Sequence, residues 1–420
     1  MAEWLKAAVL KTVEAQVSVG SNPTPSATRR AMRAAVWVCA TATVVAACES
    51  PTPPPPTPSP SAFDTASTAW RELPTAPLSP RHDAVALWTG SEVVVLGGTD
   101  AQPCPPGARC AFPPEPGLSD GARYDPARHV WAEVSPAPVP INWASGAVLG
   151  DRLFLWVAAG VSGNETTVFL AYDLDADRWE RLALPDSSHS RRLRLVAAGN
   201  RLVAFHQSQE LGTSPDLVFD PAAGTWSEMP ADPLATSFDR DMVWTGDVLV
   251  LFGLEVVPQP GSAQPSLYRA AALDPATGAW RRYPDSEITL WNPVWFYADG
   301  RIVNPSIWSA DGGQTNNWGR SYPTGGMLDP VAGAWSPLPA PPSVLGPYVG
   351  PAVGADAWVV SDAGWALHVP AGTWIQIPEL AALEAGQAAA WAGDRLIVWG
   401  GYGWDGKTAT NLADGWEWVP

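Results

Sequence analysis

Positive charge is scarce in this chain. Its 420 residues include 25 Lys and Arg against 42 Asp and Glu, which gives a formal net charge of −17. A surface that binds nucleic acid needs clustered Lys and Arg to neutralise phosphates, so a nucleic-acid partner is excluded. A basic patch that holds the protein on a membrane is excluded for the same reason. The acidic surplus fits the solubility of an exported protein, and it leaves a sugar, a cation or a basic protein as acceptable partners.

The residues that carry most enzyme chemistry are also few. The chain has 4 Cys and 5 His, and it contains no His-Glu-x-x-His, no P-loop and no Gly-x-Ser-x-Gly elbow. We therefore predict no cofactor, no metal and no catalytic residue. Paired carboxylates that cleave a glycosidic bond stay open, because 42 acidic residues make accidental pairs plentiful.

What the chain has in excess is Trp, with 24, and Pro, with 45. Many Trp, many Pro and few Lys indicate short strands separated by turns, not long helices. The length exceeds the ~100–200 residues of one ordinary domain. A large single-domain barrel or propeller, or two smaller domains, would fit.

The N-terminal region predicts export. Residues 32–47 begin with one positive residue and continue as an apolar run that is too short to span a bilayer. They end at Val45-Ala46-Ala47-Cys48, which resembles the bacterial lipobox, and this resemblance implies that Cys48 is lipidated. The alternative is a plain secretory leader with an incidental Cys. Residues 48–66 are rich in Pro, Ser and Thr and predict a semi-rigid spacer, so the folded domain should occupy residues 67–420.

Residues 1–31 fit neither the leader nor the domain. The stretch 1–27 resembles a peptide that arises when a tRNA gene is translated by mistake, because Gly20-Ser21-Asn22-Pro23 can be encoded by the T-loop sequence that such genes share. We expect translation to start at Met32. A mass spectrum of the protein that contains a peptide from residues 2–30 would contradict this expectation.

An internal repeat is the strongest pattern in the chain. An Asp precedes a Trp by six residues in five copies, and a sixth copy has His in place of Asp: Asp125/Trp131, Asp173/Trp179, Asp220/Trp226, Asp274/Trp280, Asp329/Trp335 and His368/Trp374. We interpret each copy as a hairpin whose turn is opened by Asp and whose fifth residue has positive φ. The residues at that fifth position are types that tolerate positive φ: His129, Asp177, Gly224, Gly278, Gly333 and Gly372.

A second turn recurs between copies of the first. Each instance precedes a short apolar run: Gly90-Ser91, Gly150-Asp151, Gly199-Asn200, Gly246-Asp247, Asp299-Gly300, Ala355-Asp356 and Gly393-Asp394. Continuous apolar runs such as Val93 to Leu96 predict strands that are buried on both faces. Blades stacked around a propeller bury strands in this way. Seven instances predict seven four-stranded blades, with six as the alternative.

The repeat resembles the kelch family of β-propellers, including the central domain of galactose oxidase. Kelch repeats carry a Gly-Gly pair after the second strand, Tyr-Asp in the third and Trp opening the fourth. Here these are Gly97-Gly98, Gly400-Gly401, Tyr124-Asp125, Tyr172-Asp173 and the Trp series. The resemblance runs from about Trp70 to the C-terminus. It departs in the middle blades, where Gly253 stands alone and Asn304-Pro305 or Ser361-Asp362 replace the pair.

Two segments are candidates for the strand that closes the ring. Trp70-Arg71-Glu72 reads as an outer strand without a partner of its own, and we favour it as the fourth strand of the C-terminal blade. The alternative is that Asp414-Gly415-Trp416 supplies this strand locally.

Any ligand site should lie on one face of the ring. The connections between first and second and between third and fourth strands are short, so the long, variable loops all fall on the other face, where binding usually resides. In one loop, Cys104 and Cys110 predict a disulfide, because exported proteins form them. Two loops that we expect to be neighbours offer rings, amides and charges that suit a sugar or a peptide: Trp308, Asn316, Asn317, Trp318, Arg320, Tyr402, Trp404 and Asp405.

The galactose oxidase resemblance implies a copper–radical site only if two Tyr, two His and a thioether-linked Cys are present, and that set is not found. The sequence therefore predicts a lipid-anchored, monomeric, non-enzymatic binding or scaffold module for an unknown protein, peptide or glycan. The anchor is the expected membrane attachment, at the outer face of a bacterial membrane or at the cell surface. The alternative is an extracellular carbohydrate-active enzyme, a lyase or a glycosidase.

Overall fold

The computed structural model divides the chain into two units, Met1–Ser61 and Ala62–Pro420. It describes residues 69–108, 110, 117–141, 144–159, 166–185, 193–210, 212–257, 265–289, 292–312, 320–346, 348, 350–380 and 383–420. The predicted leader, Cys48 and the spacer lie outside the described residues, as do Asn316, Asn317 and Trp318. No helix within the described part is both long and apolar enough to cross a membrane.

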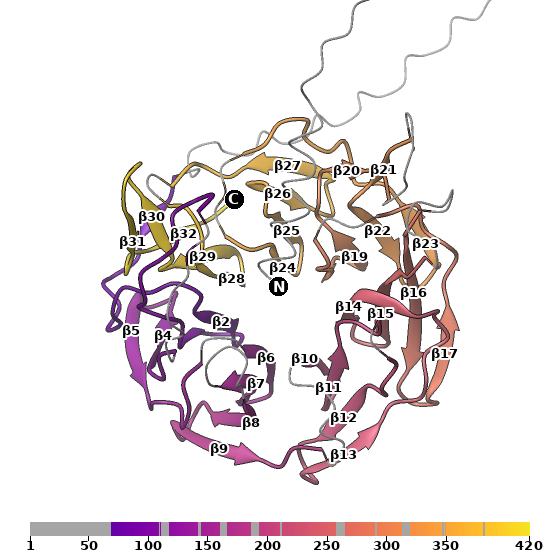
Figure 1. Ribbon diagram of the computed structural model, residues 1–420, viewed down its shortest axis with the longest axis horizontal. Helices are drawn as coiled ribbons and strands as arrows, with labels where there is room; N and C mark the ends of the chain where they lie inside the picture. The colour runs from indigo at the N-terminus through magenta and orange to yellow at the C-terminus, as the bar shows by residue number, and fades with distance from the viewer. Residues whose placement is uncertain are drawn as a thin grey trace, which may run out of the picture. The chain divides into compact units, whose positions relative to one another are not determined.

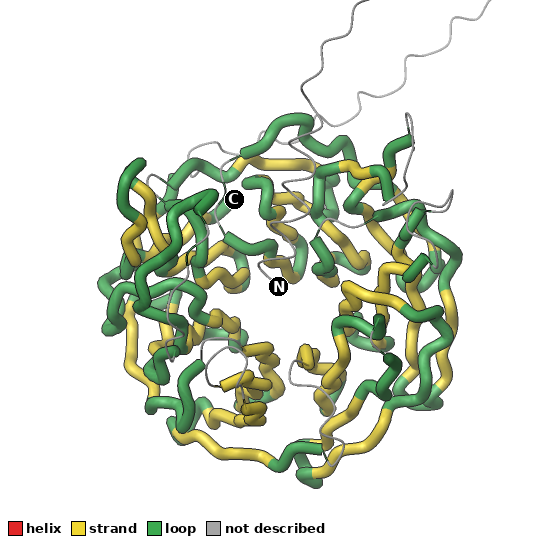
Figure 2. Tube along the Cα trace, viewed as in Figure 1, coloured by secondary structure: helices red, strands yellow, loops and turns green. Residues whose placement is uncertain are grey.

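Strands and loops make up the described part of the second unit, and the strands form four-stranded antiparallel sheets arranged in a ring (Figures 1 and 2). We number these sheets as blades 1 to 7 and name their strands from the inside outward. Blade 1 contains β2 (Val85–Trp88), β3 (Val93–Leu96), β4 (Gly121–Asp125) and β5 (Val130–Val134). Blade 2 contains β6 (Ala144–Leu149), β7 (Arg152–Ala159), β8 (Thr166–Asp173) and β9 (Arg178–Leu182). Blade 3 contains β10 (Leu193–Ala198), β11 (Arg201–His206), β12 (Leu217–Asp220) and β13 (Thr225–Glu228).

The second half of the ring repeats the pattern. Blade 4 contains β14 (Ser237–Trp244), β15 (Leu249–Glu255), β16 (Tyr268–Asp274) and β17 (Ala279–Arg282). Blade 5 contains β18 (Phe296–Ala298), β19 (Arg301–Asn304), β22 (Gly326–Asp329) and β23 (Ala334–Ser336). Blade 6 contains β24 (Val353–Ala355), β25 (Trp358–Ser361), β26 (Trp365–His368) and β27 (Thr373–Gln376). Blade 7 contains β28 (Ala388–Ala392), β29 (Arg395–Trp399), β32 (Gly415–Trp418) and β1 (Arg71–Glu72). The fold is therefore the predicted β-propeller, with seven blades and not six.

Two blades carry an extra hairpin between their second and third strands. Blade 5 inserts β20 (Ser309–Ala310) and β21 (Tyr322–Pro323), and blade 7 inserts β30 (Tyr402–Trp404) and β31 (Ala409–Asn411). Each inserted pair forms a separate two-stranded ladder. The loop-length variation seen in the sequence is thus partly regular structure.

The N-terminal strand closes the ring, as predicted. Arg71 pairs with Glu417, and Glu72 pairs with Trp416, so β1 is the outer strand of blade 7. The local alternative is wrong, because the strand that contains Trp416 is the third strand of that blade. Hydrogen bonds between β1 and β32 thus join the two ends of the domain. In blade 7, unlike in the other blades, no turn connects the outer strand to the third strand.

The core lies between blades, and alternate residues of one strand serve two interfaces. Val93 and Val95 of β3 pack against blade 7, in a cluster that includes Trp399. Val94 and Leu96 pack against blade 2, in a cluster that includes Leu155. This explains the continuous apolar run, because a sandwiched strand has no face in contact with water.

The repeated Trp ties each blade to the preceding one. Its indole N–H donates to a backbone carbonyl at the outer edge of the neighbouring blade, at 2.6–3.0 Å: Trp131 to Pro74, Trp179 to Ser135, Trp226 to Ala183, Trp280 to Pro230, Trp335 to Pro284, Trp374 to Pro339 and Trp70 to Pro378. Trp70 is therefore the seventh member of the series. These indoles are half-buried, so each hydrogen bond satisfies an N–H that packing partly shields from water.

The predicted outer turns form as expected. In the copy at Asp220, Oδ1 accepts the N–H groups of Ala222 and Ala223, and the N–H of Gly224 donates to the Asp220 carbonyl at 2.8 Å. All six residues at the fifth position have positive φ, between 47° and 70°. The sequence pattern and the backbone agree in each copy.

The Gly-Gly pairs mark places where two backbones meet. A Cβ on Gly97 would lie 2.1 Å from the carbonyl oxygen of Ile141, and both Gly97 and Gly98 have positive φ. Blades 5 and 6, which lack the pair, use side chains to turn the chain. Asn304 Oδ1 accepts the N–H of Ser306, and Ser361 Oγ accepts the N–H of Ala363. These local bonds replace the freedom of glycine.

Candidate binding face

The described ends of the long connections lie on one face of the ring, as the sequence predicted from the order of short and long turns. In blade 1, the N–H of Gly98, which begins the loop between β3 and β4, donates to the carbonyl of Ile141, which leads into β6. The loop within a blade and the segment between blades therefore share a face. We call it the loop face, and we call the opposite one, which carries the short repeated turns, the turn face.

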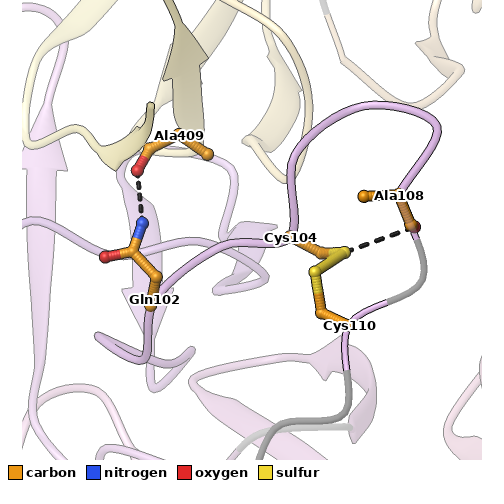
Figure 3. The surroundings of a disulfide bond; sticks show 5 residues. All are labelled: Gln102, Cys104, Ala108, Cys110 and Ala409. Atoms are coloured by element: carbon orange, nitrogen blue, oxygen red, sulfur yellow. Dashed lines mark hydrogen bonds between the residues drawn. A yellow bond between two sulfur atoms is a disulfide. The ribbon is translucent and has the colours of Figure 1, made fainter. Parts of the chain in front are cut away.

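Two insertions on the loop face brace one another. The side chain of Gln102, in the long loop of blade 1, donates to the carbonyl of Ala409 in β31 at 2.5 Å (Figure 3). The amide of Asn411 donates back to the carbonyls of Asp100 and Ala101, both at 3.0 Å. The predicted disulfide between Cys104 and Cys110 is present and closes the tip of the same loop (Figure 3). These contacts join blades 7 and 1 into one ridge.

The predicted residues of blade 7 lie on this ridge. Tyr402 and Trp404 are half-buried in β30, and Tyr402 packs its ring edge against His82 with 5.9 Å between ring centres. Asp405 is exposed, but its Oδ1 accepts the N–H groups of Lys407 and Thr408 at 2.8 and 2.6 Å. These hydrogen bonds lower the pKa of Asp405 and give the side chain a structural role in the hairpin turn.

The predicted residues of blade 5 lie elsewhere on the ring. Trp308 is half-buried before β20, where its carbonyl accepts the N–H of Thr324 at 3.1 Å, and Arg320 is exposed near β21. We expected these residues and those of blade 7 to lie on neighbouring loops, and this prediction was wrong. Blade 6 stands between them, because the order of blades around the ring follows the chain.

Buried arginines fix the segments that approach the loop face. The Arg81 side chain is 1% exposed, and its two terminal nitrogens donate to the two carboxylate oxygens of Asp120 at 2.7 and 2.8 Å. These bonds lower the pKa of Asp120. In blade 4, Arg240 is fully buried and pairs with Asp216 and Asp232 at 2.8 and 3.1 Å. Such bidentate, charge-assisted bonds hold the backbone in place.

Sequence reasoning missed a group of polar residues at the inner ends of these segments. Asp83 and Asp239 each lie five residues before a Trp-Thr-Gly sequence, and both have positive φ, 58° and 47°. They therefore occupy equivalent positions in blades 1 and 4. Burial raises the pKa of Asp239 to about 6, with Glu210 adding to the rise. Aligning the blades on that sequence would have revealed the pair.

The turn face offers a hollow of about 620 Å³ between blades 7 and 1, lined by Trp88 and several charged side chains. Its charges already pair with one another. Arg128 Nε lies 3.5 Å from Asp125 Oδ2, and Arg395 Nε lies 2.8 Å from Asp394 Oδ1. A charged ligand there would have to compete with these pairs, so the hollow is a weaker candidate than the loop face.

The chain is 31% identical over 162 residues to Kelch-like protein 34 from Homo sapiens. The match covers 36% of this chain and 23% of that protein's length. No protein-family model matches the chain. The seven four-stranded blades and this partial similarity agree with the kelch resemblance of the repeats.

Proposed function

We propose that this protein is an exported, lipid-anchored binding or scaffold module without enzymatic activity, and that it engages protein or carbohydrate ligands on its loop face. The observation that carries this proposal is the braced ridge, in which Gln102 and Asn411 join the insertions of blades 1 and 7. Rigid loops bind more tightly than mobile ones, because less conformational entropy is lost on binding. We favour a partner protein as the ligand.

The test compares the two faces with single substitutions. Trp404→Ala, on the ridge, should weaken binding of selected peptides or of glycans on an array, while circular dichroism shows an unchanged fold. Ala222→Glu places a charge at an exposed turn tip of the turn face and should leave affinity unchanged. Binding that survives Trp404→Ala and is lost with Ala222→Glu would show that the turn face is the working one.

The anchor is a separate proposal that rests on the lipobox resemblance. Cys48 would carry the lipid, and the Pro-rich residues that follow would hold the propeller away from the membrane. Cys48→Ser should release the protein into the medium or leave its leader uncleaved. Unchanged membrane fractionation of this variant, with no lipid on the N-terminus of the wild-type protein, would contradict the anchor but not the binding function.

A further inference from the structure

The inner ends of three neighbouring blades meet on the loop face beside the ridge. The N–H of Asp83, before β2, donates to the carbonyl of Gly386 at 2.8 Å. The segment before β28 then joins the ridge, because the N–H of Glu384 donates to the Tyr402 carbonyl and the N–H of Tyr402 donates to the Ala385 carbonyl, both at 2.9 Å. Asp83, Glu384 and Tyr402 are thus held in one backbone network.

Residues of blade 6 lie opposite Asp83, Glu384 and Tyr402. The N–H of Gly346 donates to the carbonyl of Ala363 at 2.8 Å, which lays the segment of Tyr348 over the turn that contains Asp362. Burial raises the pKa of Tyr348 to about 12, and the carboxylates of Asp362 and Asp83 add to the rise. Asp83 also contributes to the raised pKa of Tyr402, after burial and Glu384. A Cβ on Gly350, two residues after Tyr348, would lie 3.3 Å from the Cβ of Ala389 in β28, so this segment of blade 6 lies beside blade 7.

Asp83 and Glu384 carry negative charge at this place. Among the described residues, neither of them forms an ion pair with an arginine or a lysine. His82 is a basic residue beside Asp83: its Nε2 lies 3.7 Å from Asp83 Oδ2, and its Nδ1 is hydrogen-bonded to Asn411 Oδ1 at 2.8 Å. The side chain of Asp83 is 62% exposed, so a ligand can reach it.

A buried amide at the same place lacks partners. Gln387 is 5% exposed, and neither its Oε1 nor its Nε2 has a hydrogen-bond partner among the described residues. Its Cγ would lie 2.9 Å from a Cβ on Gly401, the residue before Tyr402, and its Cβ would lie 4.0 Å from one on Gly350, two residues after Tyr348. The Cβ and Cγ of Gln387 therefore lie between the segments that carry the two tyrosines. A buried polar group without a partner is costly and points to a ligand.

We propose that these residues form a site for the side chain of a lysine or arginine that a partner protein inserts, with Asp83, Asp362 and Glu384 as anions, Tyr348 and Tyr402 as rings and Gln387 as a hydrogen-bond acceptor. We call it the acidic rim. The proposal rests on the loop-face function above and gives that face its ligand chemistry. Carboxylates form charge-assisted hydrogen bonds with either cation, and tyrosine rings attract a cation placed over their faces.

A protein fits better here than a bare cation or a sugar. Val344 and Leu345, next to Gly346 and the turn of Asp362, are 61% and 56% exposed. Exposed apolar side chains beside a charged site match a peptide in which a basic residue is flanked by apolar ones. The net charge of −17 would also speed the approach of a basic partner.

The experiment is a selection from a random heptapeptide library on the purified full-length protein. Peptides with Lys or Arg beside apolar residues should be enriched. The double variant Asp83→Asn with Asp362→Asn should bind them about 10- to 100-fold more weakly. Asparagine keeps the shape of both side chains and tolerates the positive φ of Asp83. The control Asp175→Asn with Asp247→Asn removes the same charge from exposed turn tips on the turn face and should bind as the wild type does.

Gln387→Met keeps the length of the side chain and removes both polar atoms. It should weaken binding of the same peptides about tenfold and raise thermal stability, whereas an amide without contact to the ligand would change stability alone. Enrichment of acidic or neutral peptides, or equal affinity of the two double variants, would overturn the acidic rim. If the selected peptides then bind more weakly to Trp404→Ala, the loop-face function survives although the acidic rim does not. If their binding is weakened by Ala222→Glu and not by Trp404→Ala, both proposals fail.

Discussion

Ring closure can be tested by replacing Trp70 with alanine, because β1 is held to the propeller by few contacts. The Trp70 indole donates to the Pro378 carbonyl at 2.7 Å and packs against the cluster between blades 6 and 7. The strand adds two residue pairs with β32, and the N–H of Leu73 donates to the Gly415 carbonyl at 2.8 Å. Arg71 and Glu417 also form an ion pair at 3.2 Å.

The magnitude follows from these contacts. A fully buried Trp costs about 3–5 kcal/mol when it is truncated to Ala, so half-buried Trp70 should cost about 2–4 kcal/mol. If its loss also releases β1, the ladder hydrogen bonds add about 2 kcal/mol, at about 0.5–1.5 kcal/mol each. Trp226→Ala removes the equivalent indole from β13, which stays joined to β12 by a turn. It should cost about 2–4 kcal/mol without the additional loss.

Urea denaturation of both variants, followed by circular dichroism, measures the difference. Hydrogen exchange of β32 reports whether the seam opens, and it should speed up in Trp70→Ala and stay unchanged in Trp226→Ala. Removing residues 1–61 is a control that leaves β1 in place and should not change the urea midpoint. Equal destabilisation by the two substitutions, with β32 still protected in both, would refute the view that the seam is the weak point of the ring.

Three further predictions concern single sites. Burial raises the pKa of Asp241 to about 6 from 3.8, so the folded state holds its proton more tightly than the unfolded state. The contribution of Asp241 to the free energy of unfolding is therefore fully present below about pH 4, and it falls by about 3 kcal/mol as the pH rises past 6. Asp241→Asn should gain stability relative to the wild type between pH 4 and 7.5 in urea titrations, and a constant difference would contradict the assignment. Gly97→Ala should cost about 1–3 kcal/mol more than Gly107→Ala in the same assay, because both glycines have positive φ but a Cβ meets another backbone only at Gly97. Cys104→Ser with Cys110→Ser should lower stability by no more than about 2 kcal/mol, since the bridge closes a short loop, and a larger loss would mean that it holds the ridge.

Much of the architecture could be predicted because it is local and repeated. Five of the six outer turns have an Asp that caps them, and all six have a residue that tolerates positive φ at the fifth position. Both features can be read within eight residues. Strands buried on both faces show as continuous apolar runs, and seven such runs gave the blade count. Trp70 could be assigned to the closing strand because a repeat that begins with an outer strand needs a partner at the other end of the chain.

The site could be predicted less well, because its residues come together from distant parts of the chain. His82 and Asn411 are hydrogen-bonded across 329 residues, and no spacing rule connects them. The separation of Trp308 from Trp404 could have been predicted from the blade count, because chain order sets the position of each blade around the ring. Loop composition alone gave no indication of it.

The sequence by itself predicted the seven-bladed ring, its closure by Trp70 and the face on which the long loops lie, since these follow from hydrogen bonding and burial within each repeat. The tertiary structure decided which loops brace one another and which polar groups meet. The buried amide of Gln387 could only be found there, because whether a polar side chain has a partner depends on neighbours that three different blades supply.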